Sequence, residues 1–207
     1  MGLQQSYTLL APLYDFLVAR ASKTARQRSL QRLTIKPEQN ILISGIGSGL
    51  DIPLLPSGPY YHGIDLTRAM LKRAQRYSRD DIQLYQGDVM QLPFPAQQFD
   101  HVVMHLILAV VPEPSQALKE AERVLKPGGT IIILDKFLTP DRPAPLRRLL
   151  SPITGTIATR LDVVFEALLP HCPSLQVIDN QPALLGGWFR MITLKKAQNK
   201  PDSITQT

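Results

Sequence analysis

The chain has 207 residues, of which 44% are hydrophobic and 19% are charged. This length and composition are typical of one globular domain and argue against a disordered chain or two full-sized domains. Cys172 is the only cysteine, so no internal disulfide can form. The net charge of +6 favours an anionic partner, either a lipid surface or a nucleic acid.

Much of the positive charge precedes the first expected strand. It is carried by six basic residues, Arg20, Lys23, Arg26, Arg28, Arg32 and Lys36. Apolar residues recur between them at helical spacing over residues 13–34, which predicts one or two amphipathic helices. A basic amphipathic helix can lie on an anionic membrane surface, and an ordinary solvated face is the alternative. We expect residues 1–36 to form a helical lid.

Short apolar strands then alternate with helices along the chain. The expected strands are Ile41–Ser44, Tyr60–Asp65, Ile82–Gln86, His101–His105 and Thr130–Asp135. The expected helices are Thr67–Tyr77, which Thr67 caps, and Ser115–Leu125, which Pro127-Gly128-Gly129 ends. This alternation predicts a parallel sheet with helices on both faces and a ligand crevice at the carboxyl ends of its strands.

The C-terminal part adds a helix near Ile157–Leu169 and two further strands, Leu175–Asp179 and Arg190–Leu194. The expected fold class is therefore α/β, a Rossmann-like, doubly wound and mostly parallel sheet of seven strands. We expect a single domain over residues 1–196. Residues 197–207 are polar and have no periodicity, so we expect them to form a flexible tail.

A glycine-rich segment, Gly45-Ile46-Gly47-Ser48-Gly49, directly follows the first strand. Glycines let the backbone approach a ligand closely and adopt conformations that other residues avoid. A dinucleotide-binding loop would have a glycine at position 50 and a regular helix behind it to seat a pyrophosphate. This chain has Leu50 there, and Pro53 and Pro56 interrupt a long helix. The pattern favours a ligand without phosphates.

Two aspartates follow neighbouring strands. Asp65 ends the second strand, where a carboxylate can accept both hydrogen bonds of a ribose diol. Asp88 follows the third strand, where it can accept a hydrogen bond from the exocyclic amine of adenine. A surface or capping carboxylate is the alternative for each.

Five blocks between residues 40 and 136 resemble, in order and spacing, the class I S-adenosylmethionine-dependent methyltransferases. They are Ile41–Gly49, Tyr61–Asp65 with Met70-Leu71, Gly87-Asp88 with Leu92–Phe94, Phe99-Asp100, and Arg123–Gly129. The resemblance implies S-adenosylmethionine as cofactor and S-adenosylhomocysteine as product. It implies that the residues around the cofactor are Gly45, Gly47 and Gly49 in its cradle, Asp65 at its ribose, Asp88 and Val89 at its adenine, and Met104 and His105 at its methionine part, with Leu66 also among the cofactor-binding residues. Ile43 departs from the family, which often has an acidic residue two positions before the first glycine.

The segment Tyr7–Asp15 resembles the beginning of the N-terminal lid in two groups of methyltransferases with membrane-embedded substrates. These are the ubiquinone and menaquinone biosynthesis C-methyltransferases and the bacterial phosphatidylethanolamine N-methyltransferases. Gly49–Pro53 and Val110–Pro114 are more similar to the phospholipid enzymes. The resemblance therefore implies N-methylation of phosphatidylethanolamine, with ring C-methylation of a quinone precursor as the alternative. The expected location is the cytoplasm, with peripheral attachment at the inner membrane face through the basic N-terminal helix.

An activated methyl group needs little acid–base chemistry, but an amine acceptor must lose a proton. His105, at the end of the fourth strand, is the first candidate for the base, and a structural histidine is the alternative. Tyr7 and Tyr14 could close over the cofactor or bind a lipid phosphate, or simply pack the lid. We expect no metal site, because four histidines and one cysteine lack ligand spacing.

Two functions of other classes remain open. The basic charge is compatible with an RNA methyltransferase, although nucleic acid is not the expected partner because basic and aromatic residues are not interleaved. A cofactor-binding protein without catalysis is the other, suggested only by Ile43.

Overall fold

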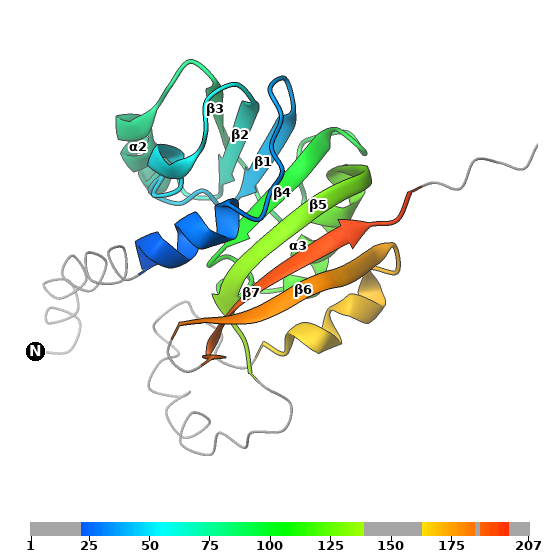
Figure 1. The fold of residues 1–207 in the computed structure, drawn as a ribbon. Coiled ribbons are helices and arrows are strands. Elements are labelled where there is room, and N and C mark those ends of the chain that lie inside the picture. The colour runs from blue at the N-terminus through cyan, green and yellow to red at the C-terminus, as the bar shows by residue number, and fades with distance from the viewer. Residues whose placement is uncertain (1–21, 139–162, 185–186, 199–207) are drawn as a thin grey trace, which may run out of the picture.

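A computed structural model describes residues 22–138, 163–184 and 187–198. Its seven strands form one sheet in the order β3-β2-β1-β4-β5-β7-β6 (Figure 1). The strands are β1 (Asn40–Ser44), β2 (Tyr60–Asp65), β3 (Ile82–Gln86), β4 (Phe99–His105), β5 (Leu125–Lys136), β6 (Leu175–Leu184) and β7 (Phe189–Lys196). The first five pair in parallel, and β7 is antiparallel to both of its neighbours. The Rossmann-like, mostly parallel sheet expected from the sequence is confirmed.

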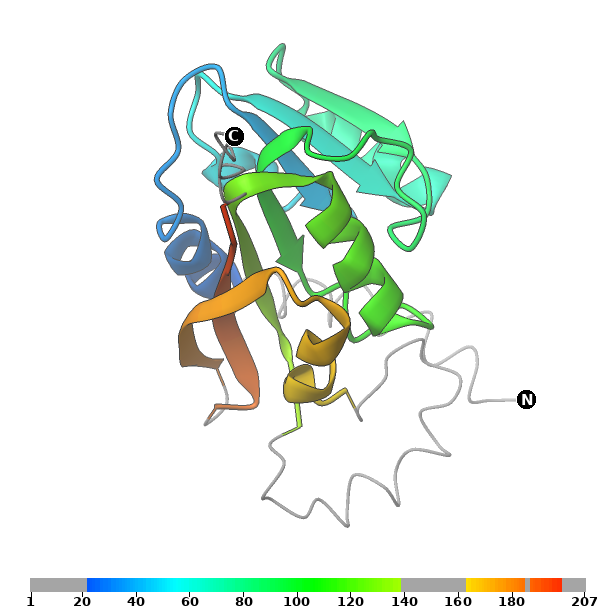
Figure 2. The same cartoon turned by 90° about the vertical axis from the view of Figure 1, so that its right-hand side faces the viewer.

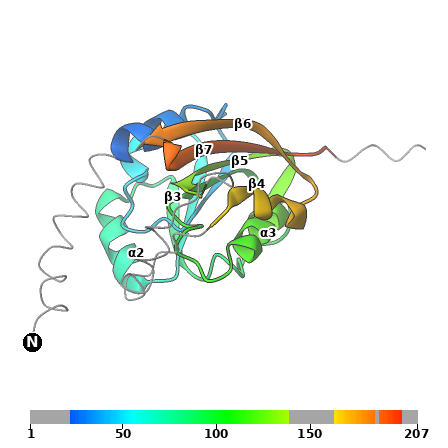
Figure 3. The same cartoon turned by 90° about the horizontal axis from the view of Figure 1, so that it is seen from below.

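Helices cover both faces of this sheet (Figure 2). Helix α3 (Pro114–Val124) lies on one face together with two 3-10 turns, η3 (Phe165–Ala167) and η4 (Leu169–His171). A helix over residues 22–30 lies on the other face, where α2 (Arg68–Ala74) also packs (Figure 3). Because both faces are buried, the central strands are apolar at consecutive positions, as in Ile131–Leu134 of β5.

The helix expected over Ser115–Leu125 agrees within one residue with α3, but the expected start of the next strand at Thr130 was wrong. Helix α3 ends at Val124, and the strand β5 already begins at Leu125. Pro127, Gly128 and Gly129 therefore lie inside the strand, where its pairing with β4 is irregular between Phe99 and His101. A Cβ at Gly129 would lie 2.9 Å from the carbonyl oxygen of Asp100, so the glycine permits a close approach of two strands.

The other boundaries need smaller corrections. Thr67 occupies the N-cap position of α2, but its side chain makes no capping hydrogen bond. The α-helix ends at Ala74 and continues as a 3-10 turn, η2 (Gln75–Tyr77). The C-terminal strands are longer than expected. Of the helix expected near residues 157–169, residues 157–162 lie outside the described residues, and residues 163–169 contain the 3-10 turn η3 and the start of η4 in place of an α-helix. No helix in the described part of the chain is long and apolar enough to span a membrane.

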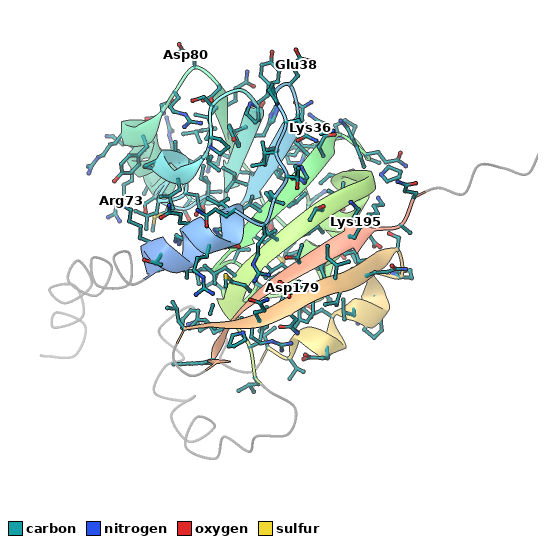
Figure 4. The ribbon with its side chains drawn as sticks, in the orientation of Figure 1. Lys36, Glu38, Arg73, Asp80, Asp179 and Lys195 are labelled. Atoms are coloured by element: carbon teal, nitrogen blue, oxygen red, sulfur yellow. The ribbon has the colours of Figure 1, made fainter. Side chains whose placement is uncertain are left out.

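The helix over residues 22–30 is anchored to the antiparallel side of the sheet. Ala25 packs against Leu134 and Met191. Just after the helix, Arg32 forms an ion pair with Asp179 of β6, labelled in Figure 4, and donates a hydrogen bond to Gln181. The charge of Arg32 is therefore neutralised by Asp179, and Arg32 does not contribute to an unpaired basic surface.

We predict that Leu118→Ala lowers the free energy of unfolding by about 2–5 kcal/mol. Leu118 is fully buried in α3, and its truncation removes apolar contacts and leaves a cavity. Lys119→Ala, at an exposed neighbouring position, is the control and should change stability by less than about 0.5 kcal/mol. Urea unfolding measures both, and an L118A loss as small as that of K119A would contradict the packing described.

Candidate methyl-transfer site

The glycine-rich loop connects β1 to a short 3-10 turn. Gly45, Gly47 and Gly49 all have positive φ angles of 77°, 56° and 82°. The turn η1 (Ile52–Leu54) has a proline in its first positions, and no α-helix begins behind the loop. The helix N-terminus that seats a pyrophosphate is thus missing here, as the prolines predicted.

The three glycines differ in what surrounds them. A Cβ at Gly45 would lie 2.5 Å from the side chain of Ile107, and one at Gly49 would lie 2.8 Å from the Cα of Ala74. A Cβ at Gly47 would meet no atom within 4 Å. Gly47 is therefore the glycine of this loop that faces open space, where a ligand can approach the backbone.

Asp65 is held directly beside the loop. Its Oδ2 accepts the backbone N–H of Gly47 at 2.9 Å, and its Oδ1 accepts the backbone N–H of Thr67 at 2.9 Å. A carboxylate has about four acceptor positions, so these bonds orient Asp65 and leave others for a ligand. The next residue, Leu66, is 66% exposed.

Asp88 lies after the adjacent strand. Its Oδ1 accepts the backbone N–H of Met90 at 2.8 Å, and Val89 between them is buried. The ends of β2 and β3 are also joined, because the side-chain amide of Gln86 donates to the carbonyl oxygen of Leu66. Asp65 and Asp88 therefore follow paired strands at the same edge of the sheet.

The end of β4 and the turn after it lie next to the glycine-rich loop. Met104 is fully buried in the core on the α3 face. His105 is also buried, with its Nδ1 2.9 Å from Oδ1 of Asp51 and its Nε2 3.0 Å from Oγ of Ser29. Leu106 then turns with a positive φ of 58° and donates its N–H to the carbonyl oxygen of Leu134.

The chain matches a family model described as a methyltransferase domain over residues 42–133, which contain the glycine loop and both aspartates. It is 29% identical over 190 residues to a phosphatidylethanolamine N-methyltransferase of Cereibacter sphaeroides, covering 89% of this chain and 93% of that protein. This protein is an S-adenosylmethionine-dependent methyltransferase.

Two further comparisons describe the same methyltransferase. It is 36% identical over 120 residues to a demethylmenaquinone methyltransferase of Staphylococcus saprophyticus, and these residues span 55% of this chain and about half, 51%, of that protein. A solved structure of geranyl diphosphate methyltransferase in complex with S-adenosylmethionine superposes with a TM-score of 0.71 at 14% identity, over 85% of each chain. At that identity the structural likeness concerns the fold.

The sequence of this methyltransferase did not lead us to expect Asp51, Ser29 and Arg26 beside the site. Asp51 is 2% exposed, and its Oδ2 accepts a hydrogen bond of 2.9 Å from the guanidinium of Arg26. Arg26 also donates to Oγ of Ser22. Residues 22, 26 and 29 are polar and recur at helical intervals, so they form a polar stripe on one face of the helix. This stripe is the feature of the sequence that could have indicated a buried polar contact.

The electrostatics of this methyltransferase also distinguish its buried carboxylates. Burial alone raises the pKa of Asp51, but His105 and Arg26 outweigh it and hold that pKa well below its usual value. Asp135, at the end of β5, is fully buried, and burial raises its pKa to about 6 although it accepts the backbone N–H groups of Lys136 and Ala109. The latter bond fixes the turn that follows β4.

A cavity of about 280 Å³ lies beside the β6–β7 pair. It is lined by Glu166, Asn180, Pro182, Gly187 and Arg190. The Arg190 guanidinium is 2.6 Å from Glu166, donates to Asn180 at 3.0 Å, and lies over the rings of two phenylalanines. Because Arg190 pairs with Asp135 in the sheet, the cavity is at the carboxyl end of β5.

The two candidate tyrosines, Tyr7 and Tyr14, lie outside the described residues of the methyltransferase. Among the residues that the structure does describe, no cluster of three or more His, Cys, Asp or Glu side chains could hold a metal ion.

Cys172 is a free, buried thiol, and burial raises its pKa to about 12.

We predict that Asp51→Asn lowers the free energy of unfolding by about 3 kcal/mol at pH 7, because it leaves Arg26 buried without its counter-charge. The stabilisation from Asp51 is fully present above its unfolded pKa near 3.8 and is lost as the pH falls toward the lower folded value. The difference between wild type and D51N should therefore shrink by about 1 kcal/mol between pH 7 and pH 3.

Urea unfolding at the two pH values measures this difference. Asp80→Asn is the control, because Figure 4 shows Asp80 at the outer end of the loop after α2, and it is exposed. A D51N loss that grows on acidification would contradict the assigned direction of the pKa shift.

Proposed function

We propose that this methyltransferase transfers methyl groups to the amine of phosphatidylethanolamine. The observation that carries the proposal is the extent of the match to the phosphatidylethanolamine enzyme, which covers 89% of this chain and 93% of that protein. The match reaches beyond residues 42–133, into the flanks where an acceptor would bind. The menaquinone enzyme of Staphylococcus saprophyticus matches over 55% of this chain.

The cofactor is proposed to lie along the loop edge. Gly47 offers it open space, Asp65 would accept the ribose hydroxyls beside Leu66, and Asp88 with Val89 would flank the adenine. Gly45 and Gly49 shape the loop, and Met104 and His105 end the strand next to it. S-adenosylmethionine, when bound, supplies an activated methyl group. The protein residues mainly have to orient the acceptor and exclude water.

The proposed acceptor region is the cavity at the end of β5. Glu166 and Arg190 pair with each other in the structure, and a headgroup that carries an ammonium and a phosphate would bind by replacing this ion pair with one contact to each side chain. Arg190 lies two strands from the end of β4, which is about 10 Å at normal strand spacing. A headgroup bound there would be near the proposed cofactor edge.

Membrane attachment is proposed at the inner face, through exposed basic residues of the N-terminal region. Lys23, Arg28 and Lys36 are exposed and available for an anionic surface. Arg26 and Arg32 are excluded from this role because they pair with Asp51 and Asp179. The contribution of Arg20, and those of Tyr7 and Tyr14 to closing the site, stay predictions.

A quinone precursor is the second candidate acceptor. The identity to the Staphylococcus saprophyticus menaquinone enzyme is 36%, higher than to the phospholipid enzyme, although over fewer residues. The phospholipid enzyme matches over 190 residues and the menaquinone enzyme over 120, so coverage rather than identity favours the phospholipid.

We predict that Gly47→Ala weakens binding of S-adenosylhomocysteine by at least tenfold but costs only about 1 kcal/mol of stability. The added Cβ meets no protein atom but stands in the space proposed for the cofactor, and φ of 56° is tolerated by alanine at moderate cost. Isothermal titration and urea unfolding test the two parts. Ser48→Ala is the control, and unchanged affinity in G47A would contradict the proposed cofactor position.

The acceptor is tested by incubating the enzyme with labelled S-adenosylmethionine and vesicles that contain phosphatidylethanolamine and phosphatidylglycerol, or a demethylated menaquinone. We expect label in the phospholipid headgroup. Arg190→Gln should raise KM for the phospholipid about tenfold without changing S-adenosylhomocysteine affinity, whereas Arg76→Gln, at an exposed site, should change neither. Label in the quinone alone would overturn the phospholipid proposal.

A further inference from the structure

The helix over residues 22–30 turns polar side chains toward the sheet. Ser22, Arg26 and Ser29 are 4%, 8% and 1% exposed, while Lys23, Thr24 and Arg28 face outward. Replacing a buried ion pair by apolar residues is often neutral or stabilising, so burial of Arg26 is not explained by stability alone. A fixed docking position of this helix is a better explanation, since each polar group requires its own partner.

The direction of each hydrogen bond follows from the donors and acceptors. Ionised Asp51 can only accept, so His105 carries a hydrogen on Nδ1 and donates it to Oδ1, while Arg26 donates to Oδ2. The Nε2 of His105 can then accept the hydroxyl hydrogen of Ser29. The chain of contacts therefore runs from the helix through Ser29 and Arg26 to both His105 and Asp51.

This network reaches the two segments that border the proposed cofactor site, the loop at residues 45–51 and the end of β4 with the turn after it. We call these two segments the cofactor edge. Asp51 comes two residues after Gly49, and its carbonyl oxygen accepts the N–H of Leu54, so it terminates the glycine loop. His105 ends β4 directly before the turn whose Ile107 side chain occupies the space beside Gly45. Movement of Asp51 or His105 therefore shifts the loop against the turn.

We propose that Arg26 and Ser29 are positioning residues for the cofactor site. They act through Asp51 and His105 and make the cofactor affinity depend on the docked position of the helix over residues 22–30. The proposal rests on cofactor binding and is independent of which acceptor is methylated. Since coupling between two sites is reciprocal, cofactor binding also stabilises the docked helix.

The test measures binding of S-adenosylhomocysteine by isothermal titration to the full chain. Ser29→Ala should weaken binding about tenfold, and Arg26→Gln should weaken it by a similar factor. Thr24→Ala, at an exposed position of the same helix, is the control and should bind like wild type. Circular dichroism melting verifies that each variant is folded.

A double-mutant cycle separates positioning from general destabilisation. If Ser29 acts through His105, the double variant Ser29→Ala, His105→Asn should bind no more than about twofold more weakly than His105→Asn alone. Wild-type affinity in folded S29A and R26Q, or full additivity in the cycle, would overturn the proposal. Absence of binding by the wild type would also overturn it and would contradict the cofactor assignment, whereas a negative acceptor assay would leave it intact.

Discussion

The carboxylate of Asp51 is the constraint on which the cofactor edge depends. It is buried, and it holds His105 at the end of β4 and Arg26 on the covering helix at the same time. A buried charge with neither partner would cost several kcal/mol, so the glycine loop, the strand end and the helix must meet in one arrangement. The family resemblance of the strands and the loop does not by itself require this link.

The same arrangement gives a physical reason for Ile43. This side chain is 1% exposed and lies in a core cluster with Leu30, Leu33, Val103 and Ile132. The segment that begins with the helix over residues 22–30 supplies Leu30 and Leu33 to that cluster. An acidic residue at position 43 would be buried among these apolar groups without a compensating charge, which is unfavourable.

The sheet could be predicted from the sequence because its signals are local. Ile41–Ile43 is a continuous apolar run, the glycine loop directly follows that strand, and Asp65 ends β2. The start of β5 was predicted too late, at Thr130, because Pro127 and Gly128 have the chemistry of a helix end, while pairing with β4 already begins at Leu125. Tertiary pairing outweighed the local signal.

The candidate site was predictable only in part. His105 was singled out from its position, but its partners Ser29 and Asp51 are 76 and 54 residues away along the chain. Arg26 was interpreted as one of several basic surface residues, since charge in a sequence does not reveal a buried carboxylate opposite it. Contacts of this range come from the packing of the helix on the sheet, and the polar stripe at residues 22, 26 and 29 does not reveal which residues of the sheet it meets.

Hydrogen–deuterium exchange of the wild-type protein, with and without saturating S-adenosylhomocysteine, tests most directly that the helix and the cofactor edge are one coupled unit. The prediction is slower exchange in the loop at residues 45–51 and also in the helix at residues 22–30, where the network of Ser29, Arg26 and Asp51 transmits the effect. Slower exchange in the loop with an unchanged helix would contradict the account.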